Sequence, residues 1–581
     1  MTPIGRRSLR LAAALLLAAA PRGATQAPGV RGDAAVPGRA PLADFVLEAA
    51  DGRRLHLVAE DRERRLTVLW VAALECAATQ AVAPAIGELA RAQAPRGVRF
   101  LALDPASGDD AAELQALASA ARLDFPLLCD PLQVVSERLG VATTATALLL
   151  DAEFREVARL ELGGAGDAAT RVAPLAAAIE AALAARPLDP TAAAAPSHGV
   201  PLASLRPAAR VAPTFFRDVA PLLWRHCVEC HRPGEIGPMS FLDGEEAQGW
   251  APQIAEITGD GRMPPWHANP RFGQFRNERS LTETEKRTLA DWAAGGAPLG
   301  EPGDAPPPPT FPSEEWSIGT PDLVLELPAV QSIPAEGVVP YRYLPVDPRF
   351  TEDRFVEAVE IRPTNRAVTH HVAVFLIPPG TKPGLLDPNH HFAGSAPGGR
   401  PLELPAGEAK RVARGSRFLF QLHYAPIGTA ASDRTRMALR FAREPVVREH
   451  ANWTLSNDHV VLEPQQAGVE FTRREVFRAP IEVTGLLPHM HWRGRAMRVE
   501  LERGGARSIV LDVPAFDFGW QHTYEFVEPL RLAAGDALRV TATYDNSAAN
   551  PRNPDPSQRV KVGEQSSDEM MVLYVDYVKA K

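Results

Sequence analysis

Two cysteines and a histidine stand together near the middle of the chain, in the run Cys227-Val228-Glu229-Cys230-His231. A Cys-x-x-Cys-His run is the attachment pattern of a c-type haem, because the two thiols form thioethers with the haem vinyl groups and the adjacent imidazole binds the iron. Zinc is the rival, since His226 and His231 flank both cysteines. Structural zinc pairs usually come from two separated segments, so the motif favours haem.

The opposite face of a haem iron needs a ligand from further along the chain. Met263 lies in a proline-rich loop, and a thioether there would raise the reduction potential. Met239 and His267 remain alternatives. Residues 213–300, which have a helical pattern, resemble a class I cytochrome c domain, and that resemblance places the axial methionine in such a loop.

Four short motifs in the C-terminal part of the chain carry imidazole or thioether groups. His489 and His491 are two residues apart, so in a strand they share one face and can bind one metal. His370 and His371 are adjacent and would point to opposite faces of a regular strand. Both could bind one metal only at a strand end or a bulge. The other two motifs contribute His423, in an alternating strand, and Met570.

The order of these motifs resembles the copper type II, ascorbate-dependent monooxygenases, whose members include the peptidylglycine α-hydroxylating and dopamine β-monooxygenases. The resemblance covers most of residues 316–581. It implies an electron-storing copper in a first β-sandwich and an oxygen-activating copper in a second. The implied ligands are His370, His371 and His423 for the first copper, and His489, His491 and Met570 for the second.

Copper also suits these donors chemically. Imidazole binds both copper oxidation states, and a thioether favours Cu(I), the state that must meet O₂. Iron bound by two histidines and a carboxylate fits less well, because no Asp or Glu lies in the His-Met-His segment.

Three positions refine the resemblance. The animal enzymes brace their sandwiches with disulfides, yet no cysteine follows Cys230, so packing alone must hold the two lobes. The peptide-amidating members place an arginine two residues before the His-x-His pair, where this chain has Leu487, so peptide amidation is not expected. Tyr574 matches a substrate-pocket tyrosine of the family, and a core position on the last strand is an equally plausible place for it.

The first 27 residues indicate export. Arg6, Arg7 and Arg10 form a basic region, and residues 11–20 are an apolar run too short to span a bilayer. The arginine pair could mark a twin-arginine signal, and an uncleaved amphipathic start is the alternative. No transmembrane segment is expected later, so the mature protein is expected in the periplasm or outside the cell. A net charge of −9 argues against a nucleic-acid partner.

Proline- and alanine-rich linkers, at residues 186–212 and 301–315, divide the rest of the chain into blocks. The first block, residues 40–185, alternates strand and helix patterns and therefore predicts an α/β fold. Strands are expected at 66–73, 98–103 and 145–151, and helices at 84–93, 110–121 and 172–185.

This first block resembles a thioredoxin-like or peroxiredoxin-like domain, with Cys76 after the first long strand, where those families keep a reactive thiol. No second cysteine completes a Cys-x-x-Cys motif, and Thr144-Ala145 stands where those families place a cis-proline. The thiolate would lack a resolving partner and the bend that presents substrate. A redox-silent, structural domain is expected; a Cys76–Cys129 disulfide or a weak thiol function are the alternatives.

The remaining blocks differ in their hydrophobic period. Helices are predicted at 215–227 and 282–294, the second with Thr282 as N-cap and Glu285 three residues on. Strand patterns throughout the C-terminal block predict two tandem β-sandwiches, at residues 316–450 and 451–581. A further pair, His390 and His391, lies in a Pro/Gly/Asn-rich stretch and is expected at the surface.

The sequence thus predicts a multidomain protein with two copper ions and one haem c. Its expected function is an exported monooxygenase that uses O₂ to hydroxylate a C–H bond of an organic substrate. The haem at His231 would relay electrons to the first copper from a redox protein, replacing or supplementing an ascorbate-like reductant. One alternative is a non-enzymatic electron-transfer or copper-binding protein. Another is a set of adhesion modules around a cytochrome.

Overall fold

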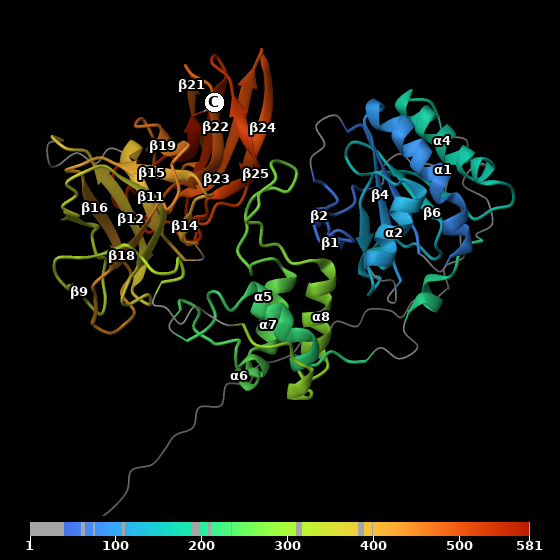
Figure 1. Cartoon of the computed structure of the whole chain (residues 1–581), viewed down its shortest axis with the longest axis horizontal. Helices are drawn as coiled ribbons and strands as arrows, with labels where there is room; N and C mark the ends of the chain where they lie inside the picture. Colours follow the sequence, from blue (N-terminus) through green and yellow to red (C-terminus); the bar gives the residue numbers. More distant parts are fainter. Residues whose placement is uncertain are drawn as a thin grey trace, which may run out of the picture.

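The computed structural model describes residues 40–59, 64–73, 76–106, 111–187, 198–206, 211–233, 235–309, 316–381, 388–397 and 399–579. The expected export signal at residues 1–27 lies outside them, as do parts of both linkers. Figure 1 shows an α/β domain (blue), a helical block (green) and a large β region (yellow to red). Among the described residues, none of the helices has both the length and the apolar character needed to cross a membrane.

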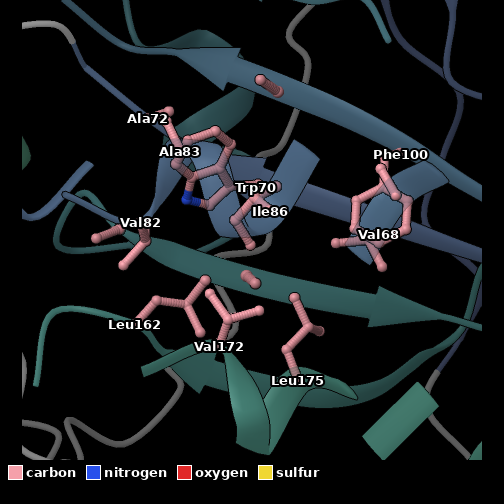
Figure 2. Packing of buried hydrophobic residues seen from close by; sticks show 14 of the residues in the cluster. Val68, Trp70, Ala72, Val82, Ala83, Ile86, Phe100, Leu162, Val172 and Leu175 are labelled. Carbon is pink, nitrogen blue, oxygen red and sulfur yellow. The ribbon is translucent and has the colours of Figure 1, made fainter. Parts of the chain in front are cut away.

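The α/β domain is built on one mixed sheet with the strand order β2-β1-β5-β4-β3-β6-β7. Every residue of β3 is buried, because helices cover one face and loops the other. Figure 2 shows part of this core, where Trp70 of β3 packs with Ile86 of α1 and Val172 of α4 lies close by. The strands are β1 (Val46–Ala49), β2 (Arg54–His56), β3 (Leu66–Val71), β4 (Val98–Asp104), β5 (Leu127–Cys129), β6 (Thr146–Leu150) and β7 (Glu156–Glu161). The helices are α1 (Ala77–Gln93), α2 (Ala111–Ala121), α3 (Val134–Arg138) and α4 (Ala168–Leu183), with η1 (Ala94–Arg96) between α1 and β4.

Two helices of this domain begin earlier than the sequence predicts. Helix α1 was expected from residue 84, but Cys76 caps it, its sulfur accepting the backbone N–H of Thr79 at 3.5 Å. Helix α4 was expected from residue 172, but Asp167 caps it by accepting the N–H of Thr170 at 2.8 Å. In both cases the side-chain cap, rather than the apolar pattern, sets the first turn.

Cys76 is almost fully buried, and all four cysteines of the chain are thiols, so the alternative Cys76–Cys129 disulfide is wrong. Burial raises the pKa of Cys76, but hydrogen bonds with Thr144 and Thr79 outweigh burial and lower it overall. Part of the first linker lies alongside: Thr144 donates its backbone N–H to the Val200 carbonyl at 3.0 Å, and Val200 donates its N–H to Thr144 Oγ1 at 2.8 Å. The linker therefore covers the loop before β6, beside the thiol.

The helical block has its own apolar core around Phe215, Leu223 and Trp292. The predicted helix at 282–294 is confirmed with its capping box, because Thr282 and Glu285 each bond the other's backbone N–H. The predicted helix at 215–227 is split into a π-helical turn, η4 (Phe215–Val219), and α5 (Ala220–His226). The other helices are α6 (Gly244–Gly249), α7 (Ala251–Gly259) and α8 (Glu283–Ala294), with the short turns η3 (Leu202–Leu205) before the block and η5 (Pro302–Asp304) after it.

Both lobes of the β region are sandwiches that share one nine-stranded sheet, of order β25-β22-β28-β19-β15-β11-β18-β8 with β14 paired to β11. The expected boundary at residue 450 falls inside β19, which pairs with β15 of the first lobe in parallel. The sequence predicted that packing alone holds the two lobes, because no disulfide can join them. Main-chain hydrogen bonds between β15 and β19 join them as well. The shared sheet contains β8 (Leu323–Glu326), β11 (Arg354–Arg362), β14 (Leu402–Glu403), β15 (Glu408–Val412), β18 (Arg436–Phe441), β19 (Arg448–Ser456), β22 (Ile481–His489), β25 (Tyr524–Leu532) and β28 (Val572–Lys579).

Each lobe closes with a four-stranded sheet of its own, packed on its half of the shared sheet. In the first lobe this sheet has the order β10-β16-β12-β13: β10 (Arg342–Val346), β16 (Arg417–Tyr424), β12 (Thr369–Ile377) and β13 (His391–Ser395), after the turn η6 (Pro388–His390). In the second lobe it has the order β21-β26-β23-β24: β21 (Ala467–Val476), β26 (Ala537–Asp545), β23 (Gly494–Arg503) and β24 (Ala506–Val513). Two small ribbons pair β9 (Gln331–Ile333) with β17 (Ala431–Asp433), and β20 (Val461–Leu462) with β27 (Val560–Lys561).

The helical block is docked on the second lobe by an extended segment, residues 269–277, that lies along the edge strand β25. Arg276 donates its N–H to the Glu525 carbonyl, and Val527 donates its N–H to the Gln274 carbonyl, both at 2.9 Å. Phe275 inserts into the core of the second lobe. Backbone pairing plus a buried aromatic ring fixes the block on the lobe.

The α/β domain is docked on the other side of the helical block through buried charged groups. Arg54 of β2 pairs with Glu285 of α8 at 2.7 Å, and Glu285 also contacts His226, the residue before Cys227, at 2.9 Å. His56 of the same strand lies between Asp44 and Glu278, at 2.5 Å from each. The linker at residues 186–212 does not by itself decide whether this domain docks on the rest of the chain, and these contacts show that it does.

Candidate metal centre

The first histidine set is assembled across two neighbouring strands, β12 and β16. His371 is paired directly with His423, and the register shifts between Thr369 and His371, which leaves His370 as the extra residue of a bulge. This bulge is one of the two arrangements, a strand end or a bulge, in which the sequence allowed both adjacent histidines to face one metal. Nitrogen atoms of His370, His371 and His423 lie within 4.8 Å of one another, and the Nδ1 atoms of the adjacent pair are 3.0 Å apart.

These three rings are held neutral by their surroundings. Burial lowers the pKa of His370 and His371, and burial together with the nearby His370 lowers the pKa of His423 to about 3. The Nδ1 atom of His423 is buried and makes no hydrogen bond within the described residues. A buried imidazole nitrogen with a lone pair and no donor nearby is well suited to bind a metal ion.

The second histidine set lies at the end of β22. His489 and His491 have ring centroids 5.3 Å apart at an angle of 90°, and Met490 between them points away into the core. His489 donates through Nδ1 to Gln521 Oε1 at 2.5 Å, and His491 donates through Nδ1 to the Asp568 carbonyl at 3.3 Å. Each ring therefore keeps an Nε2 lone pair, and the Nε2 of His491 is buried without a hydrogen bond in the described part of the chain.

Glu569 is a functional residue that the sequence did not single out. Its fully buried carboxylate accepts the backbone N–H of Arg493 at 2.7 Å, of His491 at 3.1 Å and of Met570 at 3.3 Å. Burial raises its pKa to about 8, although these three hydrogen bonds act in the opposite direction. Glu569 thereby ties the turn that carries the His-x-His pair to the segment that carries the methionine.

Histidines of both sets line one cavity of about 250 Å³, which Met570 and Tyr574 also line. They are His370 and His371 of the first set, and His489 and His491 of the second. The ring of Phe518 separates the two sets: it stacks on His370 at a centroid distance of 5.1 Å and lies 6.1 Å from His491. Tyr574, for which the sequence allowed a pocket or a core position, lines the pocket with its ring 6.3 Å from that of His489.

His391 corrects one expectation. It was assigned to an exposed loop, but it begins strand β13, and its ring lies 4.8 Å from that of Tyr574 in the cavity wall. Burial and the neighbouring Lys410 lower its pKa to about 3, and its Nδ1 atom is buried without a hydrogen bond among the described residues. The Pro/Gly-rich composition around it concealed the short strand.

The two cysteines of the haem motif line a separate cavity with His231. Both thiols are protonated, because burial raises the pKa of Cys230 and raises that of Cys227 to about 12. Met263 and Met239 line the same cavity, and Met239 lies with its sulfur 3.0 Å from His231 Nδ1, while His267 is not part of its lining.

The donor set of this second cavity fits a c-type haem: two thiols, one imidazole and thioethers in apolar surroundings. The cavity itself measures about 80 Å³, so its side-chain walls would have to part to admit a porphyrin. The first cavity fits copper, because its donors are neutral imidazoles and a thioether, and because buried imidazole nitrogens at the site have no hydrogen-bond partner among the described residues.

Two protein families match parts of the chain. Residues 39–157 match the AhpC/TSA family, and residues 464–581 match the C-terminal domain of the copper type II ascorbate-dependent monooxygenases. The chain therefore has a thioredoxin-like domain and, in its second β lobe, a copper-monooxygenase domain, which implies copper as the metal. These two parts of the predicted resemblance are confirmed, and the cytochrome c-like part stays a prediction.

Solved structures resemble the N-terminal part only loosely. One is a hypothetical protein from Sinorhizobium meliloti, with 26% identity and a TM-score of 0.26, and the match covers 29% of this chain and 93% of that one. Another is an uncharacterized conserved protein from Geobacillus kaustophilus, with 24% identity and a TM-score of 0.23, and the match covers 25% of this chain and 82% of that one. A third is a secreted disulfide oxidoreductase from Mycobacterium tuberculosis, with 20% identity and a TM-score of 0.19, and the match covers 22% of this chain and 94% of that one. No curated protein matches the chain.

Proposed function

We propose that this protein is an exported dicopper monooxygenase that hydroxylates a C–H bond of an organic substrate with O₂ and receives electrons through a covalently bound haem c. The observation that carries the proposal is the shared cavity, because neutral histidines of both sets line a single space of about 250 Å³ together with Met570 and Tyr574. An electron-transfer protein with no substrate would not need that space between its metals.

The chain's own residues have distinct tasks in this reaction. Copper, when bound, supplies one-electron storage and O₂ activation. His370, His371 and His423 would hold one ion, and His489, His491 and Met570 the other. Gln521 and the Asp568 carbonyl fix the rings of the second set, so that each presents Nε2 to the metal. Phe518 and the buried walls limit water between the two sets.

The haem part of the proposal is supported by the second cavity. Cys227 and Cys230 would form the thioethers, His231 would bind iron on one face, and Met263 is the ligand proposed for the other. Haem attachment of this kind and exposed copper chemistry suit a periplasmic or secreted protein, which agrees with the export signal proposed at residues 1–27. The electron donor would be an ascorbate-like reductant or a redox protein.

Metal and haem content of the purified mature protein is the first test. We expect two coppers and one haem c, read by elemental analysis and by the alkaline pyridine spectrum of the haem. The double variant C227A/C230A should lose the haem and keep both coppers, and Cys76→Ala, in the α/β domain, serves as the matched control. Absence of copper from the wild-type protein would reject the monooxygenase proposal.

Turnover is tested through O₂ uptake driven by ascorbate, with incorporation of ¹⁸O into a panel of small organic compounds. His491→Ala should abolish both signals, because it removes a ligand of the second copper. His459→Ala, which removes an exposed histidine of the same lobe, should leave them unchanged. Copper-loaded protein that never incorporates ¹⁸O would favour the non-enzymatic electron-transfer alternative.

The relay is tested by changing the reductant. Loss of Cys227 and Cys230 should slow turnover with a protein donor while ascorbate remains effective. Equal loss with both reductants would reject the relay and leave the copper chemistry standing.

A further inference from the structure

One short turn touches both metal-binding cavities of the molecule. Residues 514–523 connect β24 to β25 in the second lobe (Figure 1). The turn is held firmly, because the Asp517 carboxylate accepts the N–H of Gly519 at 2.7 Å and a hydrogen bond from Arg552 at 2.7 Å. Gln521 in turn donates its side-chain amide to the Phe518 carbonyl at 3.1 Å. Side chains on this turn therefore have fixed positions.

On the copper side, the turn contributes Phe518. Its ring is nearly parallel to that of His370, with an interplanar angle of 13°, and it also lies 6.1 Å from His423 and 6.1 Å from His491. Phe518 is 5% exposed, so these contacts exclude water. A single aromatic ring thus lies against histidines of both sets.

On the haem side, the turn contributes Trp520. This tryptophan lines the cavity that also contains Cys227, Cys230 and His231. It lies two residues from Phe518, so a few covalent bonds join the wall of the haem cavity to the ring that packs on the copper ligands.

A more direct route between the cavities is interrupted. A cleft of about 380 Å³ lies between the helical block and the first lobe, and Cys230 and His370 stand on its walls. Electron transfer falls steeply with distance and is slower across open space than through bonded and packed atoms. The turn is therefore a packed connection between the two cavities, while the direct line from Cys230 to His370 crosses the cleft.

We propose that the turn from Phe518 to Trp520 is the electron path between the haem cavity and the copper ligands, entered at Trp520 and left through Phe518 to His370. The inference rests on the proposed function. Each event moves one electron: haem iron is oxidised from Fe(II) to Fe(III), one Cu(II) is reduced to Cu(I), and no bond is formed or broken. The external reductant, dithionite in the experiment, supplies the electron to the haem.

The test uses full-length protein loaded with haem and Cu(II), mixed without O₂ with half a molar equivalent of dithionite, a two-electron reductant, so that one electron enters per protein molecule. Reoxidation of the haem is followed by its absorbance, and reduction of copper by loss of its EPR signal. Trp520→Leu should slow haem reoxidation by about tenfold, or about 1.4 kcal/mol of activation free energy. Haem content, copper content and direct reduction of copper by ascorbate should stay as in the wild type, which a merely structural role would not predict.

Three further variants make the test specific. Trp520→Phe should recover much of the rate, because an aromatic ring is kept. Phe518→Leu should slow transfer like Trp520→Leu, and the double variant should be little slower than either, because both residues lie on one path. Trp453→Leu removes a tryptophan of the same lobe outside both cavities and should have no effect on transfer.

The outcomes separate this inference from the proposed function. Absence of haem or copper in the wild-type protein would overturn both. An unchanged rate of haem reoxidation in fully loaded Trp520→Leu, or additive slowing in the double variant, would overturn the path alone.

Discussion

Histidine is buried at two places in this molecule, with opposite consequences. Around the copper cavity, five rings lie close together, no carboxylate in the described part of the chain hydrogen-bonds to them, and burial lowers the pKa of each. At the interface of the α/β domain with the helical block, His56 lies between Asp44 and Glu278. Burial alone would lower its pKa, but these two hydrogen bonds raise it to about 9.

The difference shows that partners, rather than burial, decide what a buried histidine does. A ring that meets only amides, carbonyls and other rings stays neutral and keeps a lone pair for a metal. A ring between two carboxylates is charged and acts as an interdomain ion pair. Substitutions of these partners should therefore have opposite effects on the pKa values of the buried histidines in the two regions.

The largest effect is expected from Glu569→Ala in the copper cavity. The substitution leaves three buried backbone N–H groups without an acceptor, which should cost about 3–5 kcal/mol of unfolding free energy. The second copper should also be lost, while the first, held by β12 and β16, should remain. Urea unfolding and copper content measure the two effects.

Glu528→Ala is the matched control, because Glu528 is exposed on β25. A Glu569→Ala protein with wild-type stability and both coppers would show that the carboxylate does not organise the second site.

The next largest effect is the pH dependence of stability that comes from His56, at the interface of the α/β domain with the helical block. His56 has a pKa of about 9 in the folded protein and about 6.5 in the unfolded protein. Its contribution to the free energy of unfolding is therefore complete below pH 6.5 and is lost as the pH rises through 9. The whole shift corresponds to about 3 kcal/mol. We expect wild-type stability to fall across this range and His56→Gln to show much less dependence, by urea unfolding at several pH values.

His459→Gln, at an exposed position of the second lobe, should keep the wild-type pH dependence. If His56→Gln kept it as well, the two carboxylates would not hold a charged ring between the domains.

A smaller effect is expected at Gln521, the amide partner of His489. Gln521→Leu removes the acceptor that orients the ring, so the affinity of the second site for copper should fall about 10- to 100-fold. Gln521→Glu recreates the environment of His56 inside the cavity and should raise the pKa of His489 in the copper-free protein. Copper titration and histidine NMR measure these outcomes, and an unchanged pKa in Gln521→Glu would contradict the comparison.

The smallest effect is expected at an ion pair exposed to solvent. Glu229 contacts Arg400 at 3.5 Å, and both side chains are more than half exposed. Glu229→Gln should change stability by less than about 1 kcal/mol and lose even that at high salt. A larger loss in thermal unfolding would show that exposed charges also help to hold the helical block on the first lobe.

Local patterns predicted the parts of this structure that depend on neighbouring residues. The spacing of His489 and His491 implied one face of a strand, and the capping box at Thr282 marked the start of a helix. The adjacent pair His370 and His371 required a strand end or a bulge. Each of these follows from a few consecutive residues and the period of one element.

The contacts that complete the site join residues far apart in the chain, and no local period encodes them. Phe518 and Gln521 reach the histidines from a loop, and Glu569 bonds backbone groups of the His-x-His turn. The segment 269–277, rich in turn residues, forms a β-bridge at Phe275 only because the edge of β25 offers hydrogen bonds. Side-chain caps likewise moved the starts of α1 and α4 beyond what the apolar pattern indicated.

The sheet shared by the two β lobes has a further consequence for how such a site can diversify. Because β15 and β19 are paired through the main chain, backbone hydrogen bonds hold the two lobes in register with each other. The first histidine set lies on the separate sheet of β12 and β16, which packs on the shared sheet through apolar side chains. A substitution in that packing layer would therefore move one histidine set against the other while the two lobes stay joined.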